Sequence, residues 1–131
     1  VVAWRVLIQP ATALESDWAE FSVAEFKEYW GRKPIIMDFT ADWCANCKVL
    51  ESTVLTKDRL EAWAERYGAV FIKADLTQDN PAAQAMLQAL DSASIPVVAL
   101  FPAGGNADSP LVLRDLFTTQ QIETAINKTF R

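Results

Sequence analysis

Both cysteines of the chain lie in one stretch, Asp38-Phe39-Thr40-Ala41-Asp42-Trp43-Cys44-Ala45-Asn46-Cys47-Lys48. The residues that lead into this stretch, 34–39, are mostly apolar and favour a β-strand. From Cys44 to Leu55, apolar residues recur at the spacing of one helix face. The pattern therefore predicts a buried strand over residues 34–40, a short connection, and a helix that begins at Cys44.

The position of Cys44 at a helix start indicates a reactive thiol. Unpaired backbone N–H groups and the positive end of the helix dipole stabilise a thiolate there. Cys47 follows three residues later on the same helix face. It is close enough to attack a mixed disulfide formed at Cys44, yet it points further into the protein. We therefore predict that Cys44 is the nucleophile and Cys47 the resolving thiol.

Non-redox uses of two cysteines fit this chain less well. A structural zinc site or an iron–sulfur cluster needs four ligands, and the chain has two cysteines and no histidine, so carboxylates would have to complete a zinc site. The cysteines could also be two inert buried thiols or a purely structural bridge, although a bridge that closes so small a loop constrains the unfolded chain little. The pattern favours redox chemistry at the two thiols, with no metal or other cofactor.

The composition is that of one globular domain. Of the 131 residues, 51% are hydrophobic and 22% are charged. A net charge of −5 without a cluster of Lys or Arg argues against nucleic acid or an anionic membrane surface as a partner. No apolar run approaches the roughly 20 residues of a membrane-spanning helix, so we expect no membrane insertion by this chain. The start at Val1, without a signal-peptide pattern, suits a fragment of a longer protein, and we expect a monomer.

The order of the predicted elements places the cysteines inside one domain. Residues 1–17 are predicted to be an N-terminal tail or linker, in which residues 1–8 form an extra strand or an extended segment. The domain over residues 18–131 begins with a short strand at 18–21. The elements predicted after it are helix 23–30, strand 34–40, helix 44–55, helix 58–67, strand 69–74, helix 82–90, strand 96–101, strand 111–116 and a last helix capped by Thr118 or Thr119 that ends near Lys128.

The chain resembles thioredoxin-fold proteins in Trp43–Lys48, in Asp38 six residues before the first cysteine, and in the downstream Ile95-Pro96. Within that superfamily, Phe39–Cys44 and Glu51 resemble the C-terminal periplasmic domain of the DsbD-type thiol:disulfide interchange proteins, and ScsB-like relatives are similar. The resemblance covers nearly the whole predicted domain. It implies an α/β protein with a thioredoxin fold, in which a central mixed β-sheet is flanked by helices on both faces.

The resemblance gives two acids a role beside the cysteines. Asp38 lies on a strand expected to be buried, where a carboxylate is costly unless it is hydrated or paired. The family would use it beneath the cysteine pair, with a raised pKa, to relay a proton to or from Cys47; the alternative is a strand-end acid that points to solvent. Glu51 follows Cys44 by two helical turns, and it is either a second acid near the cysteines or an exposed helix acid. Two carboxylates there would oppose ionisation of Cys44 until a partner docks.

Two lysines and three tryptophans are expected to support the site and the core. Lys73 lies on the strand beside the central one, where it either pairs with Asp38 or is solvated. Lys48 is expected to be a surface charge that modestly favours the thiolate. The tryptophans expected to serve in packing are Trp18, Trp30 and Trp63.

The residues expected to dock a partner surround the cysteine pair. Trp43, in a loop before an exposed thiol, is expected to form part of this surface. By the resemblance Pro96 is cis, and the backbone of Ile95 is free to pair with an extended partner segment. The dipeptide between the cysteines, Ala45-Asn46, has no histidine that would stabilise a thiolate, so we expect a reductant.

The resemblance implies an enzyme that passes reducing equivalents by dithiol/disulfide exchange, a protein-disulfide reductase. Electrons would arrive from a transmembrane domain and leave to periplasmic disulfides. The expected partners are therefore protein thiols and disulfides in the transmembrane and N-terminal domains of the same parent, an inner-membrane protein whose soluble domain lies in the periplasm. A free-standing thioredoxin-like reductase would fit the same motif. A redox-silent binding module with the same fold belongs to another functional class, which the intact C-x-x-C motif disfavours.

Overall fold

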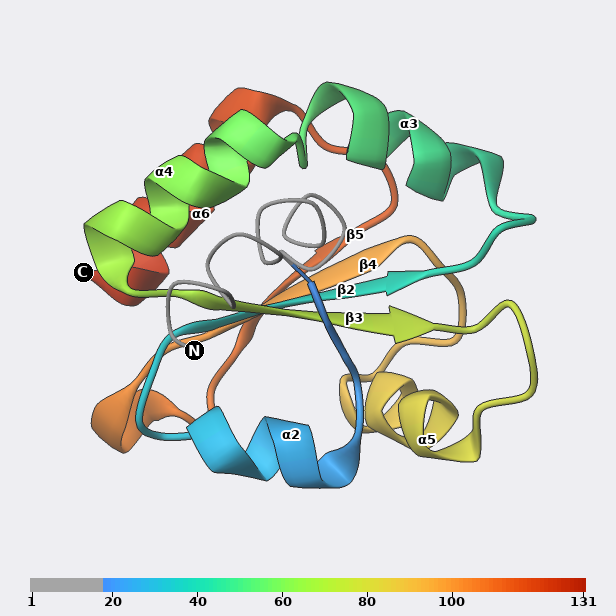
Figure 1. Ribbon diagram of the computed structural model, residues 1–131, viewed down its shortest axis with the longest axis horizontal. Helices are drawn as coiled ribbons and strands as arrows, with labels where there is room; N and C mark the ends of the chain where they lie inside the picture. The colour runs from blue at the N-terminus through green and yellow to red at the C-terminus, as the bar shows by residue number, and fades with distance from the viewer. Residues whose placement is uncertain (1–17) are drawn as a thin grey trace, which may run out of the picture.

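The computed structural model describes residues 18–131, and the element labels follow Figure 1. The tail or linker expected over residues 1–17, with its extra strand, lies outside the described residues. None of the helices within the described part is long and apolar enough to cross a membrane. The elements are β1 (Ala19–Glu20), α2 (Val23–Tyr29), β2 (Ile35–Thr40), α3 (Ala45–Thr53), α4 (Lys57–Tyr67), β3 (Val70–Asp75), α5 (Pro81–Ala89), β4 (Val97–Phe101), the 3-10 turn η1 (Gly104–Asn106), β5 (Leu111–Arg114) and α6 (Thr119–Phe130).

The strands form one sheet in the order β1-β3-β2-β4-β5. β1 and β2 run parallel to β3, whereas β4 is antiparallel to both β2 and β5. Helices α3, α4 and α6 cover one face of the sheet, and α2 and α5 cover the other (Figure 1). The predicted α/β architecture, a mixed sheet between two helical layers, is confirmed.

β2 occupies the centre of the sheet because it is apolar on both faces, and all six of its residues are buried. Ile35, Met37 and Phe39 belong to the core beneath α2 and α5, whereas Ile36 belongs to the core on the opposite face. Asp38, the one charged residue of the strand, is buried with the rest. The predicted central strand is confirmed, and the alternative in which Asp38 points to solvent is wrong.

Local signals in the sequence set the ends of several helices. The Ser22 hydroxyl accepts a hydrogen bond from the backbone N–H of Glu25 at the start of α2. Thr118 and Gln121 form a reciprocal capping box at the start of α6. Gly68 ends α4 with a φ of 70°, a left-handed conformation that glycine adopts without a steric penalty. These predicted termini are confirmed.

Within the described part, the element boundaries differ from the prediction by no more than two residues. The strand predicted over 111–116 ends at Arg114, because Asp115 takes a left-handed φ of 63° that interrupts the extended backbone. The last helix continues to Phe130 instead of ending near Lys128.

The three tryptophans expected to serve in packing differ in burial. Trp63 is buried in the core, and Trp18 is half-buried with its ring 5.6 Å from that of Phe71. Trp30 is 44% exposed at the end of α2, although its Nε1 donates a hydrogen bond to the Ala107 carbonyl. The Trp30 ring nevertheless stacks on that of Phe26, with 6.2 Å between the ring centres, so the expectation that these tryptophans pack is confirmed.

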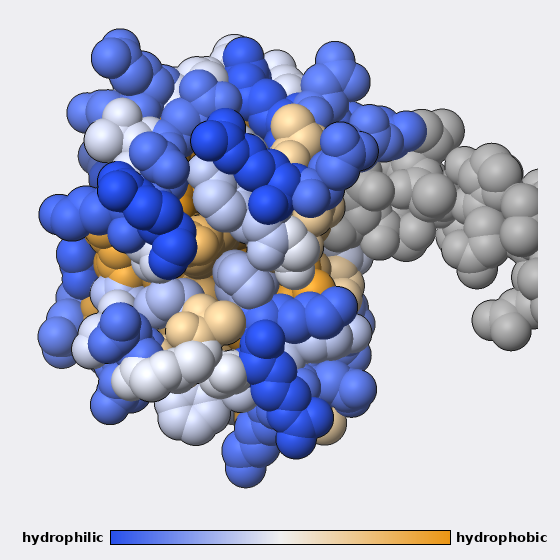
Figure 2. Space-filling model, turned by 90° about the vertical axis from the view of Figure 1, so that its left-hand side faces the viewer, coloured by the Kyte–Doolittle hydropathy of each residue, from blue (hydrophilic) through white to orange (hydrophobic). Residues whose placement is uncertain are grey.

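The surface at the end of the molecule where α4 finishes is mostly hydrophilic. Figure 2 views this end, which is the left-hand side of Figure 1, and apolar areas show there only between hydrophilic side chains. The cysteines lie at the opposite end, where β2 leads into α3.

Candidate active site

The two cysteines form a disulfide at the start of α3. Cys44 is the N-cap of the helix, and its Sγ accepts a hydrogen bond of 3.2 Å from the backbone N–H of Cys47. Cys47 lies nearer the sheet, with its Sγ 4.0 Å from the carbonyl oxygen of Phe39. Cys44 is 7% exposed and Cys47 is 2% exposed. The structure thus places the two sulfurs as the sequence predicted, one at the helix start and the other deeper.

A second loop packs against the disulfide. The Ile95-Pro96 peptide bond is cis, as the resemblance implied. Half-buried Ile95 contacts the small cluster formed by Ala41 and the two cysteines. The carbonyl of Pro96 accepts a hydrogen bond from the backbone N–H of Asp115, which ties this loop to the end of β5. Segments that are distant in the sequence therefore meet at the sulfur pair.

Asp38 lies on the sheet face that α3 covers. Its side chain is 2% exposed, and its Oδ2 has no hydrogen-bond partner among the described residues. Burial raises the pKa of Asp38 from 3.8 to about 7; the charge of Glu51 also raises it, whereas Lys73 and Lys48 act in the opposite direction. An acid with this pKa can both accept and release a proton at neutral pH.

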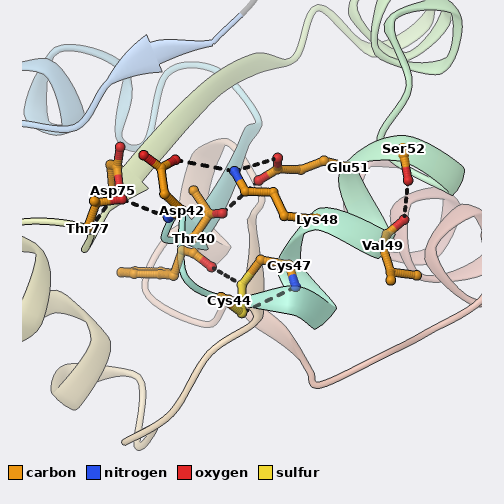
Figure 3. Close-up of polar contacts among 11 residues, drawn as sticks. Thr40, Asp42, Cys44, Cys47, Lys48, Val49, Glu51, Ser52, Asp75 and Thr77 are labelled. Carbon is orange, nitrogen blue, oxygen red and sulfur yellow. Dashed lines mark hydrogen bonds and ion pairs between the residues drawn. A yellow bond between two sulfur atoms is a disulfide. The ribbon is translucent and has the colours of Figure 1, made fainter.

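Glu51 belongs to a polar cluster beside the disulfide (Figure 3). Its Oε2 accepts a hydrogen bond of 2.6 Å from the Thr40 hydroxyl, and its Oε1 lies 3.4 Å from the Lys48 ammonium. Lys48 also pairs with Asp42 at 3.5 Å. Because the Glu51 side chain is only 22% exposed, the alternative of an exposed helix acid is wrong. Lys48 thus links the carboxylates of Asp42 and Glu51, a contact that was not predicted when Lys48 was expected to be a surface charge.

Lys73 takes a position that the sequence did not predict. It lies opposite Asp38 in the β2–β3 ladder. Its Nζ lies instead 5.5 Å from the centre of the Trp18 ring, and the ion pairs found among residues 18–131 do not include it. Of the two alternatives for Lys73, the pairing with Asp38 is therefore absent within the described part, although the charge of Lys73 still lowers the pKa of that carboxyl.

Most of the expected docking residues lie at the surface around the disulfide, whereas Pro96 is buried. Trp43 is 67% exposed, and Ala45 and Asn46 are exposed on the first turn of α3. The Asn46 side-chain amide donates a hydrogen bond of 3.3 Å to a carboxylate oxygen of Asp115. With half-buried Ile95 nearby, these side chains border the sulfur pair. Their part in binding a partner stays a prediction.

Sequence reasoning missed three polar residues of this site. Thr40 contacts Glu51, and its spacing of two residues from Asp38 on the same strand was the available signal. Thr77 accepts a hydrogen bond from the backbone N–H of Asp42 at 2.8 Å. Thr77 and Asp115 lie in loops that follow β3 and β5, and a local pattern does not predict the path of a loop.

The side chains near the disulfide do not assemble a metal site. The described part of the chain holds no group of three or more Cys, Asp or Glu side chains placed to bind an ion. Asp42 and Glu51, two acids near the disulfide, both face the ammonium of Lys48. The reactive chemistry that this arrangement offers is that of the sulfur pair and the buried acid.

Comparison with known proteins identifies the family. The chain matches the family model described as thioredoxin-like over residues 17–103, so it belongs to the thioredoxin-like family. Among solved structures it is similar to thioredoxin O2 from Arabidopsis thaliana in the oxidised state, with a TM-score of 0.61 and 18% identity over 89% of this chain and 97% of that chain. The thioredoxin fold predicted from the sequence is thereby confirmed.

Within that family the chain is a thioredoxin-like domain related to DsbD. It is 33% identical over 108 residues to thiol:disulfide interchange protein DsbD 1 of Pseudomonas aeruginosa, which covers 82% of this chain and 17% of that protein. It is 34% identical over 74 residues to DsbD of Cronobacter sakazakii, or 56% of this chain and 12% of that protein. The oxidised C-terminal domain of Neisseria meningitidis DsbD is similar in structure, with a TM-score of 0.60 and 24% identity over 81% of this chain and 87% of that chain.

The chain is therefore homologous to thiol:disulfide interchange proteins and carries a C-x-x-C active-site disulfide. It spans less than a fifth of the length of the two curated relatives described above.

Proposed function

We propose that this chain is the electron-transfer domain of a larger DsbD-like protein, and that it reduces partner disulfides through Cys44 and Cys47. The observation that carries the proposal is the placement of the sulfur pair. Cys44, which is 7% exposed, caps α3, and Cys47, which is 2% exposed, lies deeper, next to the strand that carries Asp38, whose Oδ2 has no hydrogen-bond partner among the described residues. With this placement, Cys44 can attack the partner disulfide, and Cys47 can attack the resulting mixed disulfide from inside the domain.

The first step is attack by the thiolate of Cys44 on a partner disulfide. A new bond forms between Cys44 Sγ and one partner sulfur, and the second partner sulfur leaves as a thiolate and takes up a proton. The backbone N–H groups at the start of α3 favour the attacking thiolate, and one of them, that of Cys47, already donates to Cys44 Sγ.

The second step is attack by Cys47 on the Cys44 sulfur of the mixed disulfide. The Cys47 thiol first loses its proton, and we assign Asp38 as the acceptor, directly or through a water molecule, because its pKa of about 7 suits proton transfer near neutral pH. The remaining partner sulfur leaves as a thiolate and takes up a proton. Two electrons have then moved to the partner, and the Cys44–Cys47 disulfide is restored.

The partners follow from the relationship to DsbD. Electrons would reach the disulfide from the dithiol of a transmembrane domain of the same protein and leave to disulfides in the periplasm. Exposed Trp43 and the cis Ile95-Pro96 loop border the sulfur pair, where an extended partner segment would lie. A free-standing thioredoxin-like reductase would use the same chemistry, and the coding sequence upstream of Val1 would separate the two, since a DsbD-like parent requires apolar spans there.

Equilibration with glutathione tests the proposal. The purified domain should cycle reversibly between dithiol and disulfide, with a midpoint potential below roughly −200 mV, because no histidine between the cysteines stabilises the thiolate. Thiol alkylation and mass analysis at graded ratios of reduced to oxidised glutathione would measure the potential. A midpoint near −120 mV, typical of a strong oxidant, would exclude a reductant, and a pair that does not cycle would exclude exchange altogether.

Removing the acids should make Cys44 react at lower pH. A carboxylate near a thiol opposes a second negative charge, so Cys44 alkylation in the reduced wild type should have its midpoint above the usual ~8.5. Asp38→Asn should lower this midpoint more than Glu51→Gln, because Asp38 is unpaired whereas Lys48 and Thr40 already offset the charge of Glu51. Rates of alkylation by iodoacetamide across pH would show it, and identical profiles in all three proteins would remove both acids from the mechanism.

A further inference from the structure

Trp18, Lys73 and Asp38 lie in a row across three neighbouring strands. Trp18, just before β1, packs edge-to-face on Phe71 of β3, with 5.6 Å between the ring centres. Lys73 lies two residues beyond Phe71, so both side chains are on the same face of β3. Lys73 is also opposite Asp38 in the β2–β3 ladder. The lysine therefore has an aromatic ring on one side and a buried carboxyl on the other.

The structure shows which neighbour the lysine contacts. Lys73 Nζ lies 5.5 Å from the centre of the Trp18 ring, within the distance at which an aromatic face attracts a cation. The Asp38 Oδ2 atom has no hydrogen-bond partner among the described residues. A buried carboxylate with a lysine beside it would ordinarily pair with it, because an unpaired buried charge is costly. The ring thus offers the ammonium an alternative to the acid.

We propose that Trp18 is a positioning residue for Asp38: its indole face holds the Lys73 ammonium and so keeps the buried carboxyl without a paired cation. The position of Lys73 does not depend on the proposed function, and only the effect of that position on disulfide exchange rests on it. A paired Lys73 would hold Asp38 as a fixed carboxylate, which would not readily return a proton at neutral pH. With Lys73 over the ring, Asp38 stays able to gain and lose a proton during each cycle of exchange.

The remaining charges around Asp38 come from α3 and do not move with Trp18. Glu51 raises the pKa of Asp38, and Lys48 lowers it. On the other side β4 places Val98, which has no charge, opposite Asp38. Burial is the largest cause of the raised pKa, so the effect of a moved lysine has to be separated from that of water entering the site.

Titration of the Asp38 carboxyl carbon by NMR in the oxidised domain is the direct test. Trp18→Leu keeps an apolar side chain against Phe71 but removes the aromatic face, so the midpoint should fall from about 7 by roughly one pH unit. Trp18→Phe keeps an aromatic face and should titrate close to the wild type. Fluorinated tryptophan, whose face attracts cations less, should also lower the midpoint without a change of shape, and it serves if Trp18→Leu does not fold.

Lys73→Met distinguishes an effect of the lysine on the Asp38 pKa from an effect of water that enters the site. Removing the cation should raise the Asp38 midpoint, and adding Trp18→Leu to this variant should then change nothing further. An unchanged midpoint in folded Trp18→Leu or in the fluorinated protein would overturn the proposal. So would an equal fall with and without Lys73, because that fall would come from water entering the site.

The titration also distinguishes this proposal from the proposed function. It uses the oxidised domain without a partner, so it does not depend on exchange. If the midpoints move as expected and the domain does not exchange disulfides, the position of Lys73 is explained and the proposed function is wrong. If exchange occurs and the midpoints do not depend on Trp18, only the positioning role is overturned.

Discussion

Replacing Cys47 by Ala should turn a transient mixed disulfide into the final product of the reaction. The reduced variant can still attack a partner disulfide through Cys44, but no neighbouring thiol can release the adduct. The lifetime of the adduct should rise by at least roughly a hundredfold, because an attack within one molecule is replaced by an attack from solution. Non-reducing electrophoresis after mixing with a disulfide-containing peptide, followed by mass analysis, would measure it.

Cys44→Ser is the matched control and should form no adduct. In the reduced wild type, Cys44 should be alkylated before Cys47, because the two side chains are 7% and 2% exposed in the disulfide form. An adduct through Cys47, or faster alkylation of that thiol, would reverse the two roles. The helix-capping position of Cys44 would then have no part in the choice of nucleophile.

The burial of Asp38 could be predicted from the sequence because it depends only on local pattern. A strand that is apolar on both faces has to lie inside the sheet, and any residue in it is buried whatever its chemistry. The helix start at Cys44 is equally local, since the apolar spacing after it fixes the helix. These two features were enough to bring the sulfur pair and the acid to the same end of β2.

The environment of Glu51 could not be predicted in the same way. Spacing along α3 places it on the face that carries Cys44, but its contacts depend on how α3 crosses β2. That crossing brings Thr40 to one carboxylate oxygen, whereas Lys48, three residues earlier on α3 itself, lies at the other. From its spacing along the helix alone, Glu51 cannot be distinguished from an exposed helix acid.

The position of Lys73 depends on the pairing of three strands. Its register with Asp38 follows from the fold, and it suggests an ion pair. The competing partner, Trp18, lies just before a two-residue strand at the edge of the sheet, whose register has no signature in the sequence. Contacts between side chains of paired strands are set by that register, so the structure was needed to find this one.

Asp38→Asn should raise the unfolding free energy above that of the wild type, and this difference should be larger at pH 8 than at pH 5. Folding raises the pKa of this carboxyl from 3.8 to about 7. Between these values the folded state binds more protons than the unfolded state, so the unfolding free energy of the wild type falls as pH rises and levels off above pH 7. The loss attributable to Asp38 is about 2 kcal/mol at pH 5 and about 4 kcal/mol at pH 8.

The variant has no charge at this position, so it should escape that loss. Any penalty for the buried amide of Asn is the same at both pH values and cancels when the two are compared. The stability difference between Asp38→Asn and the wild type should therefore grow by about 2–3 kcal/mol from pH 5 to pH 8. Urea unfolding of the oxidised proteins at the two pH values would measure it.

Asp42→Asn makes the same chemical change at a side chain that is 78% exposed, and its stability difference from the wild type should stay nearly constant over this range. If the Asp38→Asn difference were equally constant, the carboxyl would have to be hydrated or paired in solution, and a proton relay based on its raised pKa would fail with it. A growing difference would instead show that the fold retains a destabilising acid at its centre. In the proposed mechanism that acid has a use, because the raised pKa that lowers stability at pH 5, and further at pH 8, would also let Asp38 take a proton from Cys47 near neutral pH.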